Sequence, residues 1–296
     1  MSISNKDKTL VVLDGNALIH RAYHALPPFR TKDGRLVNAV YGFISVLFRV
    51  LKEIKPDYLA ATFDLAEPTF RDREYAQYKA KRVRAPQELY DQIPLVKEFV
   101  RAFNIPIYEK SGFEADDAIG TIVSQAAKRQ PPVKSVIVTG DMDTLQLIDK
   151  NTEVYNLREG VNDIAVYDIE AVKKRYGLKP SQIVDFKALK GDPSDNIPGV
   201  SGVGEKTAAE LVRKFGGLEK LYANLSGSDV NPKLKARLLE YKKDALMSYR
   251  LASIRRDAPL KFSFKDAKQS DYDQDKVIGF LEKMGFKSLI KRFSEI

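Results

Sequence analysis

The chain has 296 residues, enough for two domains, and its 44% hydrophobic content is typical of a globular protein with a sizeable core. It contains no cysteine, which excludes disulfides, iron–sulfur clusters and thiolate zinc sites. No apolar run is long enough for a signal peptide or a membrane span, so we expect a cytoplasmic protein without membrane contact. The net charge of +9 is compatible with binding to a polyanion, although many basic proteins bind no nucleic acid.

Up to about residue 175 the pattern alternates between strands and helices. Strands are predicted at 9–14, 57–64, 133–143 and, more weakly, 152–157 and 163–168. Helices are predicted at 38–55, with Asn38 as N-cap, and at 114–129. This alternation predicts a mostly parallel sheet with helices on both faces, in which ligands bind at the carboxyl ends of the strands. Four acids occupy those ends: Asp14, Asp64, Asp141 and Asp143.

Residues 70–90 interleave basic and aromatic side chains. Within 71–84, six Lys and Arg residues face only two acids, and Tyr75 and Tyr78 lie among them. Most such runs are solvated helix faces. The alternative is a segment that contacts phosphates and stacks on unpaired bases.

After about Tyr176 the strand pattern gives way to helices, so we place a domain boundary there. Helices are predicted around an acidic turn and a glycine-rich turn up to residue 217, and again at 232–254 and 274–284. The predicted division is therefore an α/β core at 1–175 and a helical domain at 176–296.

Nine acids are candidate metal ligands. Five come from two further clusters, "GFEADD" and "GDPSDN": Glu114, Asp116, Asp117, Asp192 and Asp195. Each segment also has an ordinary structural explanation, because acids favour the first turn of a helix, cap helices and shape turns. Capping does not explain why acids end three parallel strands, so we favour a metal site.

Oxygen ligands in a chain with only two histidines indicate magnesium or manganese rather than zinc. We interpret His20 and His24 as core or surface residues. A carboxylate pocket that holds two divalent ions about 3.5–4 Å apart is suited to in-line attack at phosphorus. Without the nine acids, 31 acidic residues oppose 49 basic ones, a balance of +18 that suits a protein gripping a polyanion.

The stretch "PGVSGVGEKTAAEL" places Gly199, Gly202 and Gly204 before a predicted helix. It is either a tight interhelical turn or a phosphate grip, in which glycines admit the DNA backbone and Lys206 adds charge. Such a grip lacks a group that reads base edges, so it would bind duplex without sequence preference.

Six segments in order, "VVLDGNALIHRAYHAL", "FDLAEPTFR", "YKAKR", "GFEADDAIGT", "VTGDMDTLQL" and "ALKGDPSDNIPGVSGVGEKTA", resemble the 5′ nuclease domain of bacterial DNA polymerase I, within the flap endonuclease family. The resemblance covers essentially the whole chain. It implies a PIN/resolvase-like core, a helical arch at about 70–103, and a C-terminal helix–three-turn–helix clamp with its hairpin at 198–206. It also implies removal of 5′ flaps and 5′ ends, including RNA primers, in replication and repair.

The resemblance assigns all nine acids to the family's metal site, with Mg²⁺ or Mn²⁺ bound. It matches Lys79 and Arg82 to bases at the scissile phosphate, Tyr78 to a ring that stacks on the displaced nucleotide, and Arg21 and Arg71 to substrate-binding arginines. The 199–206 loop resembles a K⁺-binding hairpin. The implied partner is flapped, nicked or gapped duplex DNA, and we expect a monomer acting at the nucleoid.

Two rivals stay open from the residues alone. An RNA-cleaving nuclease could share the acidic core, but the hairpin sequence argues against it. A non-catalytic DNA-binding module would explain the basic body but not nine acids. The sequence also does not distinguish a standalone enzyme from one domain of a longer polymerase.

Overall fold

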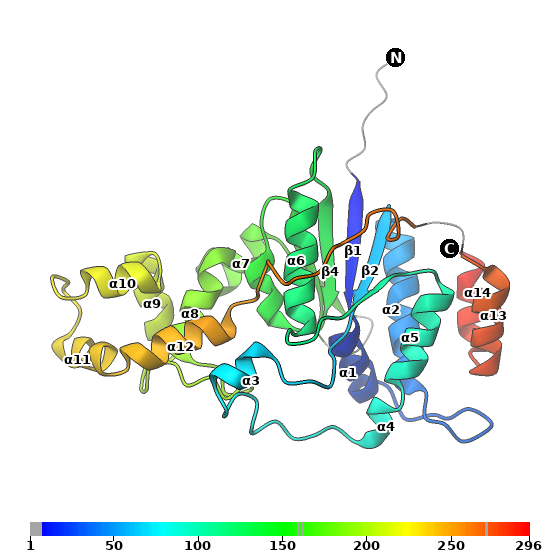
Figure 1. Ribbon diagram of the computed structural model, residues 1–296, viewed down its shortest axis with the longest axis horizontal. Coiled ribbons are helices and arrows are strands. Elements are labelled where there is room, and N and C mark those ends of the chain that lie inside the picture. The colour runs from blue at the N-terminus through cyan, green and yellow to red at the C-terminus, as the bar shows by residue number, and fades with distance from the viewer. Residues whose placement is uncertain (1–7, 159, 161–162, 270–271) are drawn as a thin grey trace, which may run out of the picture.

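The computed structural model describes residues 8–158, 160, 163–269 and 272–296 (Figure 1). Its centre is a six-stranded sheet in the order β3-β2-β1-β4-β5-β6. The strands are β1 (Thr9–Asp14), β2 (Tyr58–Thr62), β3 (Ile107–Tyr108), β4 (Lys134–Thr139), β5 (Thr152–Leu157) and β6 (Ile164–Tyr167). All neighbours are parallel except β5 and β6. The mostly parallel sheet is confirmed; the two-residue β3 has no strand signal in the sequence.

Both faces of the sheet are buried, as expected for parallel strands flanked by helices. In β1, Val11 and Leu13 join the core on one face, and Leu10 and Val12 join the core on the other. The first face is covered by α1 (Gly15–Ala25), α2 (Asn38–Ile54), α5 (Ile93–Ala102), α13 (Gln274–Lys283) and α14 (Lys287–Phe293). The second is covered by α6 (Ala115–Ala127), the 3-10 helix η1 (Met142–Leu147) and α7 (Ile169–Tyr176).

The expected N-cap of α2 is wrong by one residue. Val37 is the cap, and Asn38 is the first helical residue. Its side-chain amide instead donates to the carbonyls of Tyr23 and Leu26, at the end of α1. The residue thus ties two helices together instead of closing its own helix.

Residues 70–92 lie beyond the carboxyl ends of the parallel strands, at the bottom of Figure 1. They contain the short helices α3 (Phe70–Glu74) and α4 (Gln87–Tyr90), and residues 75–86 between them have no helix. The expected arch at 70–103 is therefore helical only at its two ends. Its last part is α5, whose Val96, Phe99 and Val100 belong to the core.

A separate hydrophobic cluster holds the helical part together. That part comprises η2 (Pro180–Gln182), α8 (Ile183–Lys190), α9 (Glu205–Phe215), α10 (Leu218–Asn224), α11 (Pro232–Glu240) and α12 (Lys242–Ala252). The single helix predicted at 232–254 is two helices that meet at Tyr241. Beyond α12 the chain returns to the sheet, where Ile254 and Val277 join the two central clusters. Within the described ranges, no helix is long and apolar enough to cross a membrane.

Candidate active site

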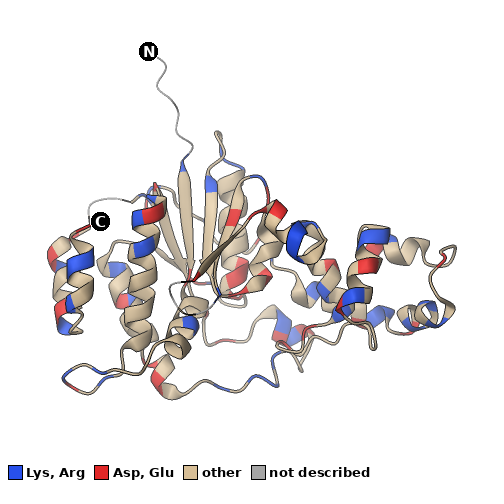
Figure 2. Cartoon of the chain, turned by 180° about the vertical axis from the view of Figure 1, so that it is seen from behind, with Lys and Arg blue, Asp and Glu red and all other residues tan. Residues whose placement is uncertain are grey.

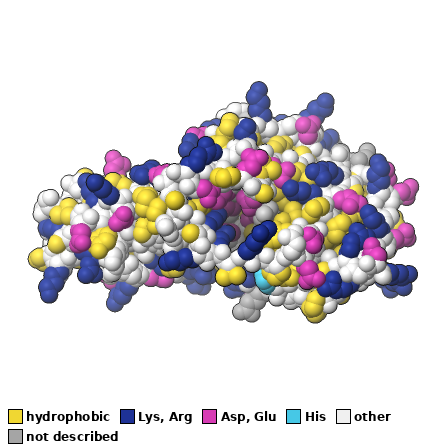
Figure 3. Space-filling model, turned by 60° about the horizontal axis from the view of Figure 1, so that its bottom comes forward, with side chains coloured by type: hydrophobic (Ala, Val, Ile, Leu, Met, Phe, Trp, Pro, Cys, Tyr) yellow, Lys and Arg dark blue, Asp and Glu magenta, His cyan; other side chains and the backbone are white. Residues whose placement is uncertain are grey.

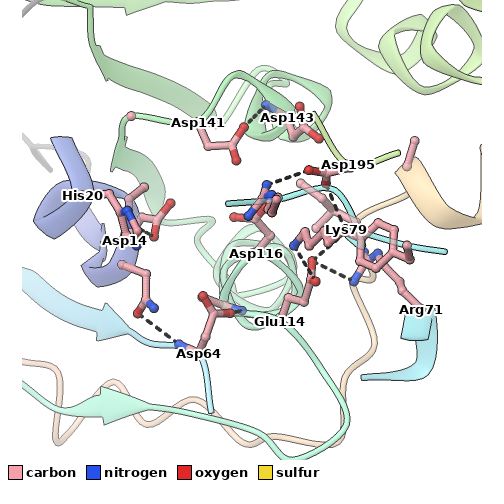
Figure 4. Close-up of a pocket in the computed structure, with 18 of the residues that line it drawn as sticks. Asp14, His20, Asp64, Arg71, Lys79, Glu114, Asp116, Asp141, Asp143 and Asp195 are labelled. Atoms are coloured by element: carbon pink, nitrogen blue, oxygen red, sulfur yellow. Dashed lines mark hydrogen bonds and ion pairs between the residues drawn. The ribbon is translucent and has the colours of Figure 1, made fainter. Parts of the chain in front are cut away.

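An open pocket of about 460 Å³ lies at the carboxyl ends of β1, β2 and β4. Seven of the nine predicted acids line it: Asp14, Asp64, Glu114, Asp116, Asp141, Asp143 and Asp195. Figure 3 shows acidic side chains gathered in this hollow, and Figure 4 shows how they surround it. The four strand-end acids converge, as the fold argument predicts.

Helix capping and pocket lining turn out to be compatible. Asp14 caps α1 by accepting from the Ala17 amide, and Asp141 caps η1 by accepting from the Asp143 amide. Glu114 is the N-cap of α6. Each cap occupies only part of a carboxylate, so the same side chain still faces the pocket.

Four of the seven acids have no basic partner among the described residues: Asp14, Asp64, Asp116 and Asp141. Burial raises the pKa of Asp14 to about 7, despite hydrogen bonds from Thr139 and Ala17, and the carboxylate of Asp141 adds to the rise. Burial likewise raises the pKa of Asp116, followed by repulsion from Asp141 and Asp14. No ion pair among the described residues therefore offsets the charge of these four carboxylates.

Basic side chains pair with the three remaining acids, and two of these, Glu114 and Asp195, pair with bases from residues 75–86. Lys79 Nζ lies 2.6 Å from Glu114 Oε1, and Arg82 Nη2 lies 2.6 Å from Asp195 Oδ1. Lys79 itself has a positive φ of 55°, an uncommon conformation for a lysine that turns the chain toward the pocket. The two bases predicted to meet the scissile phosphate thus lie at the pocket wall (Figure 4).

Asp117 and Asp192 do not line the pocket. Asp117 is fully buried behind it, where both carboxylate oxygens pair with Arg71. Asp192 pairs with Lys187 and accepts from Ser194; these contacts outweigh burial and lower its pKa to about 2. Direct metal ligation by these two acids stays a prediction. Their hydrogen bonds and ion pairs in this structure do not support it.

The predicted nucleic-acid contacts differ in accessibility. Arg71 is almost entirely buried, and its guanidinium also donates to the carbonyls of Leu251 and Ser253. Tyr78 is 6% exposed, and its hydroxyl bonds to Glu114 and Asp195, so its ring is covered as it lies. Arg21 lines the pocket and donates to the Gly140 carbonyl.

The histidines were expected in the core or at the surface. Both His20 and His24 line the pocket wall. Burial lowers the pKa of His20, with His24 as the next cause, which favours the neutral form.

The glycine-rich turn leads into α9, whose N-cap is Gly204. Gly199 and Gly202 have φ values of 64° and 76°, whereas Gly204 has ordinary φ. The buried Ser248 hydroxyl of α12 accepts from the Gly199 amide, and Lys206 is exposed. Figure 2 shows that further Lys and Arg residues occur along the helical part.

Sequence reasoning missed three residues that support the site. Thr139 donates to Asp14, Ser248 holds the turn, and Lys187 pairs with Asp143 and Asp192. The strand-end position of Thr139 was a usable signal. Lys187 and Ser248 lie in ordinary helical sequence and gave none.

Among the described residues, no three His, Asp or Glu side chains already form a set of metal ligands. The chemistry of the donors nevertheless fits a hard divalent cation, because the unpaired groups are all carboxylates. Burial raises the pKa of Asp14 and of Asp116, and carboxylate repulsion, which such a cation would relieve, adds to both rises.

The 5′-3′ exonuclease N-terminal resolvase-like domain matches residues 9–177, and the 5′-3′ exonuclease C-terminal SAM fold matches residues 178–275. DNA polymerase I of Bacillus caldotenax is 42% identical over 96% of this chain, and that of Bacillus subtilis is 42% identical over 97%. In both, the match covers 32% of the relative, so the chain spans about a third of their length.

Solved structures show the same fold at lower identity. The T5 D15 protein, co-crystallised with metal ions, has a TM-score of 0.70 at 17% identity, covering 94% of this chain and 98% of that one. The catalytic core of Rad2, in complex with DNA substrate, has a TM-score of 0.56 at 19% identity, covering 95% and 89%. With two family models that together match most of its length, this chain belongs to the 5′-3′ exonuclease family.

Proposed function

We propose that this chain hydrolyses DNA phosphodiesters at 5′ flaps and 5′ ends, and that it needs divalent metal ions, Mg²⁺ above all, to do so. One observation supports this most strongly. Carboxylates from four separate segments, Asp14, Asp64, Asp116 and Asp141, share one pocket, and none of them forms an ion pair among the described residues. The DNA and metal complexes of similar proteins agree with it.

Asp14, Asp64, Asp116 and Asp141 would hold divalent ions, which when bound would supply an activated water and stabilise the leaving oxygen. The chain's own bases do the remaining electrostatic work. Lys79 and Arg82 line the same pocket and can turn from their carboxylates to a phosphate. There they balance charge on the transferring phosphoryl group. The expected products carry a 5′ phosphate and a 3′ hydroxyl.

Duplex binding is assigned to the helical part. Gly202 and Gly204 are exposed in the turn, as is Lys206 beside them, whereas Gly199 is buried. We propose that this turn binds a DNA phosphate, with K⁺ as its bound ion. The K⁺ proposal is tested by measuring duplex affinity in K⁺ and in Na⁺ at equal ionic strength. Equal affinities would exclude a specific role for K⁺.

The decisive test of the function is Asp116→Ala on a DNA substrate with a labelled 5′ flap. Wild type should cut in Mg²⁺ and stop in EDTA, and the variant should lose at least 100-fold in rate. Equal cutting by the variant would show that the metal site is assigned wrongly. A single-stranded RNA of the same sequence is the control for the RNA-cleaving alternative.

Several wider features rest on the family. We propose a division between core and helical domain near residue 176, action as a monomer on nucleoid DNA, and work on RNA-primed flaps. The curated relatives extend well beyond the matched third, so a polymerase region is the proposed partner in a longer protein.

A further inference from the structure

Residues 252–256, where α12 ends and the chain returns to the sheet, contact two elements that carry pocket acids. One is η1, which begins at its N-cap Asp141. The other is α6, with Asp116 in its first turn. Ala252 and Ile254 of this segment also line the pocket. The contacts that the segment makes with each element decide how far apart the two elements lie.

Gln146, near the end of η1, binds the 252–256 segment at several points. Its side-chain amide donates to the Ala252 carbonyl at 3.0 Å, and its side-chain carbonyl accepts from the Ile254 amide at 2.9 Å. The backbone carbonyl of Gln146 accepts from the Arg256 guanidinium at 2.8 Å. Because Gln146 is only 5% exposed, water does not compete for these bonds. One residue thus fixes η1 to the segment.

The 252–256 segment is also fastened to α6. The Arg255 amide donates to Asp117 Oδ1, in the first turn of that helix, at 2.8 Å. The two backbones approach closely, because a Cβ placed on Gly120 of α6 would lie only 2.5 Å from the Arg255 carbonyl oxygen. The segment and α6 therefore form one packed unit, to which Gln146 joins η1.

Apolar packing holds η1 as well, but in a different way. Leu145 and Leu147, on either side of Gln146, are buried in the core on the second face of the sheet. Burial of apolar surface has no preferred direction, whereas a hydrogen bond requires a narrow range of distance and angle. Gln146 therefore supplies the directional part of the joint. Replacing it should leave η1 folded but less closely fixed.

The placement of η1 matters because the acids of the pocket lie on separate elements. Neither Asp141 nor Asp116 forms an ion pair among the described residues, so their separation follows that of η1 from α6. Groups that act together on one ion or substrate must be held within about 0.5 Å of their working geometry. A small shift of η1 would therefore change the site without removing any carboxylate.

We propose that Gln146 is a positioning residue that sets the separation of η1 from α6, and through it the separation of Asp141 from Asp116. Gln146 does not line the pocket, so it acts through these two acids and not on the substrate. The inference rests on the proposed metal-dependent function. It adds a residue outside the pocket on which the site depends.

Gln125 of α6 provides a matched control. Its side-chain amide donates to the Leu260 carbonyl at 3.0 Å, and its side-chain carbonyl accepts from the Phe262 amide at 3.1 Å. This is the same two-point bond to the returning chain, but Gln125 lies near the opposite end of α6 from Asp116 and does not line the pocket. Methionine is nearly as long as glutamine and has no amide. Gln146→Met and Gln125→Met should therefore both lower the melting temperature in EDTA.

The first measurement titrates the intact chain with Mn²⁺, without DNA, and follows the melting temperature. An ion that binds only the folded state raises this temperature according to its affinity. Gln146→Met should need on the order of 10-fold more Mn²⁺ than wild type for the same rise above its own value in EDTA, because loss of a group that orients metal ligands weakens metal binding. Gln125→Met should follow the wild-type titration.

The second measurement follows cleavage of a 5′-flap substrate in Mg²⁺ under single-turnover conditions, with duplex affinity measured separately in EDTA. Gln146→Met should cut about 10-fold to 100-fold more slowly, because small misplacements of reacting groups cost rate steeply. Its duplex affinity should match that of wild type, since the glycine-rich turn is untouched. Gln125→Met should match wild type in both properties.

A Mn²⁺ titration or a cleavage rate of Gln146→Met equal to that of wild type would overturn the proposal. Equal losses in both variants would also overturn it, because the effect would then be one of stability alone. If Gln146→Met does not fold, Gln146→Asn is measured in its place with the same expectations. Its shorter side chain reaches at most one of the two backbone partners.

Failure of the proposed function would look different. If wild type neither responds to Mn²⁺ nor cuts the flap, the metal-dependent function itself is wrong. If wild type does both and Gln146→Met equals it, only the role of Gln146 is wrong.

Discussion

Arg71 and Asp117 form a two-point ion pair, with Nη1 2.7 Å from Oδ2 and Nη2 2.9 Å from Oδ1, and their side chains are 3% and 0% exposed. The pair fastens α3, at the start of the basic segment, to the first turn of α6. Asp117 also accepts from the backbone amides of Glu114 and Arg255. A pair with so many partners is a structural joint behind the acidic pocket.

Replacing Arg71 by Met should destabilise the protein by about 3 kcal/mol or more, because it leaves a buried carboxylate without its cation. Urea unfolding measures this loss. The control is Arg73→Met on the same helix, an exposed arginine, which should change stability by less than about 0.5 kcal/mol. Equal stabilities of Arg71→Met and wild type would show that Arg71 serves only the substrate.

Replacing Asp116 by Asn should abolish cleavage and yet stabilise the metal-free protein. No hydrogen bond to the Asp116 side chain is present to be lost among the described contacts, and the change removes one charge from a repelling group. We expect a gain on the order of 1 kcal/mol at pH 8 in EDTA, measured by urea unfolding. A less stable variant at pH 8 would contradict the proposed repulsion.

Wild type and Asp116→Asn should also differ in how their stability depends on pH. The pKa of Asp116 is raised on folding, so above its unfolded value of about 3.9 the unfolded chain loses this proton first. Wild-type stability is therefore progressively reduced as pH rises, and the variant lacks this effect. The stability difference should be smaller at pH 5.5 than at pH 8. A difference that grows toward low pH would have the wrong sign.

The sequence was sufficient for five of the six strands and for the convergence of acids, because these follow from local patterns, whereas the two-residue β3 has no such pattern. Short β-branched runs that end in acids predict parallel strands, and parallel strands bring Asp14, Asp64 and Asp141 to one edge. The cap residues were harder to place. Asn38 looks like a helix cap, but its contacts with Tyr23 and Leu26 depend on how α1 and α2 pack.

Which acids line the pocket and which pair with a base behind it could not be predicted, because the basic partners lie far away in the sequence. By helical spacing alone, Glu114 and Asp117, three positions apart, lie near one helix face, and Asp116 lies on a different side. In the structure Glu114 and Asp116 line the pocket, and Asp117 turns to Arg71, 46 positions away. No local pattern contains that partner.

The glycines of the turn allow a matched comparison. A Cβ on Gly199 would lie 2.3 Å from the Gly191 nitrogen, and its φ of 64° is unfavourable for alanine. Gly199→Ala should therefore lose about 3 kcal/mol of stability and most duplex binding. Gly204→Ala has open space and ordinary φ, so its stability should change little. A loss of duplex affinity in Gly204→Ala alone would then report close approach of DNA, and a stable Gly199→Ala would contradict the steric argument.

Ser248 of α12 contacts the glycine-rich turn from its buried side, which allows a further test. Its hydroxyl is fully buried and accepts from the Gly199 amide at 2.9 Å. Ser248→Ala leaves that amide unsatisfied, at a cost of about 1–3 kcal/mol, and loosens the turn. We expect duplex affinity, measured by fluorescence anisotropy, to fall by 3-fold to 10-fold, with KM rising more than kcat falls.

Ser253→Ala is the control, since that exposed hydroxyl bonds only to the Tyr249 carbonyl of its own helix. If both variants bind duplex as wild type does, one of two explanations holds. An unchanged melting temperature of Ser248→Ala would show that the turn is rigid without Ser248, and a lowered one would show that the turn is not the duplex-binding element.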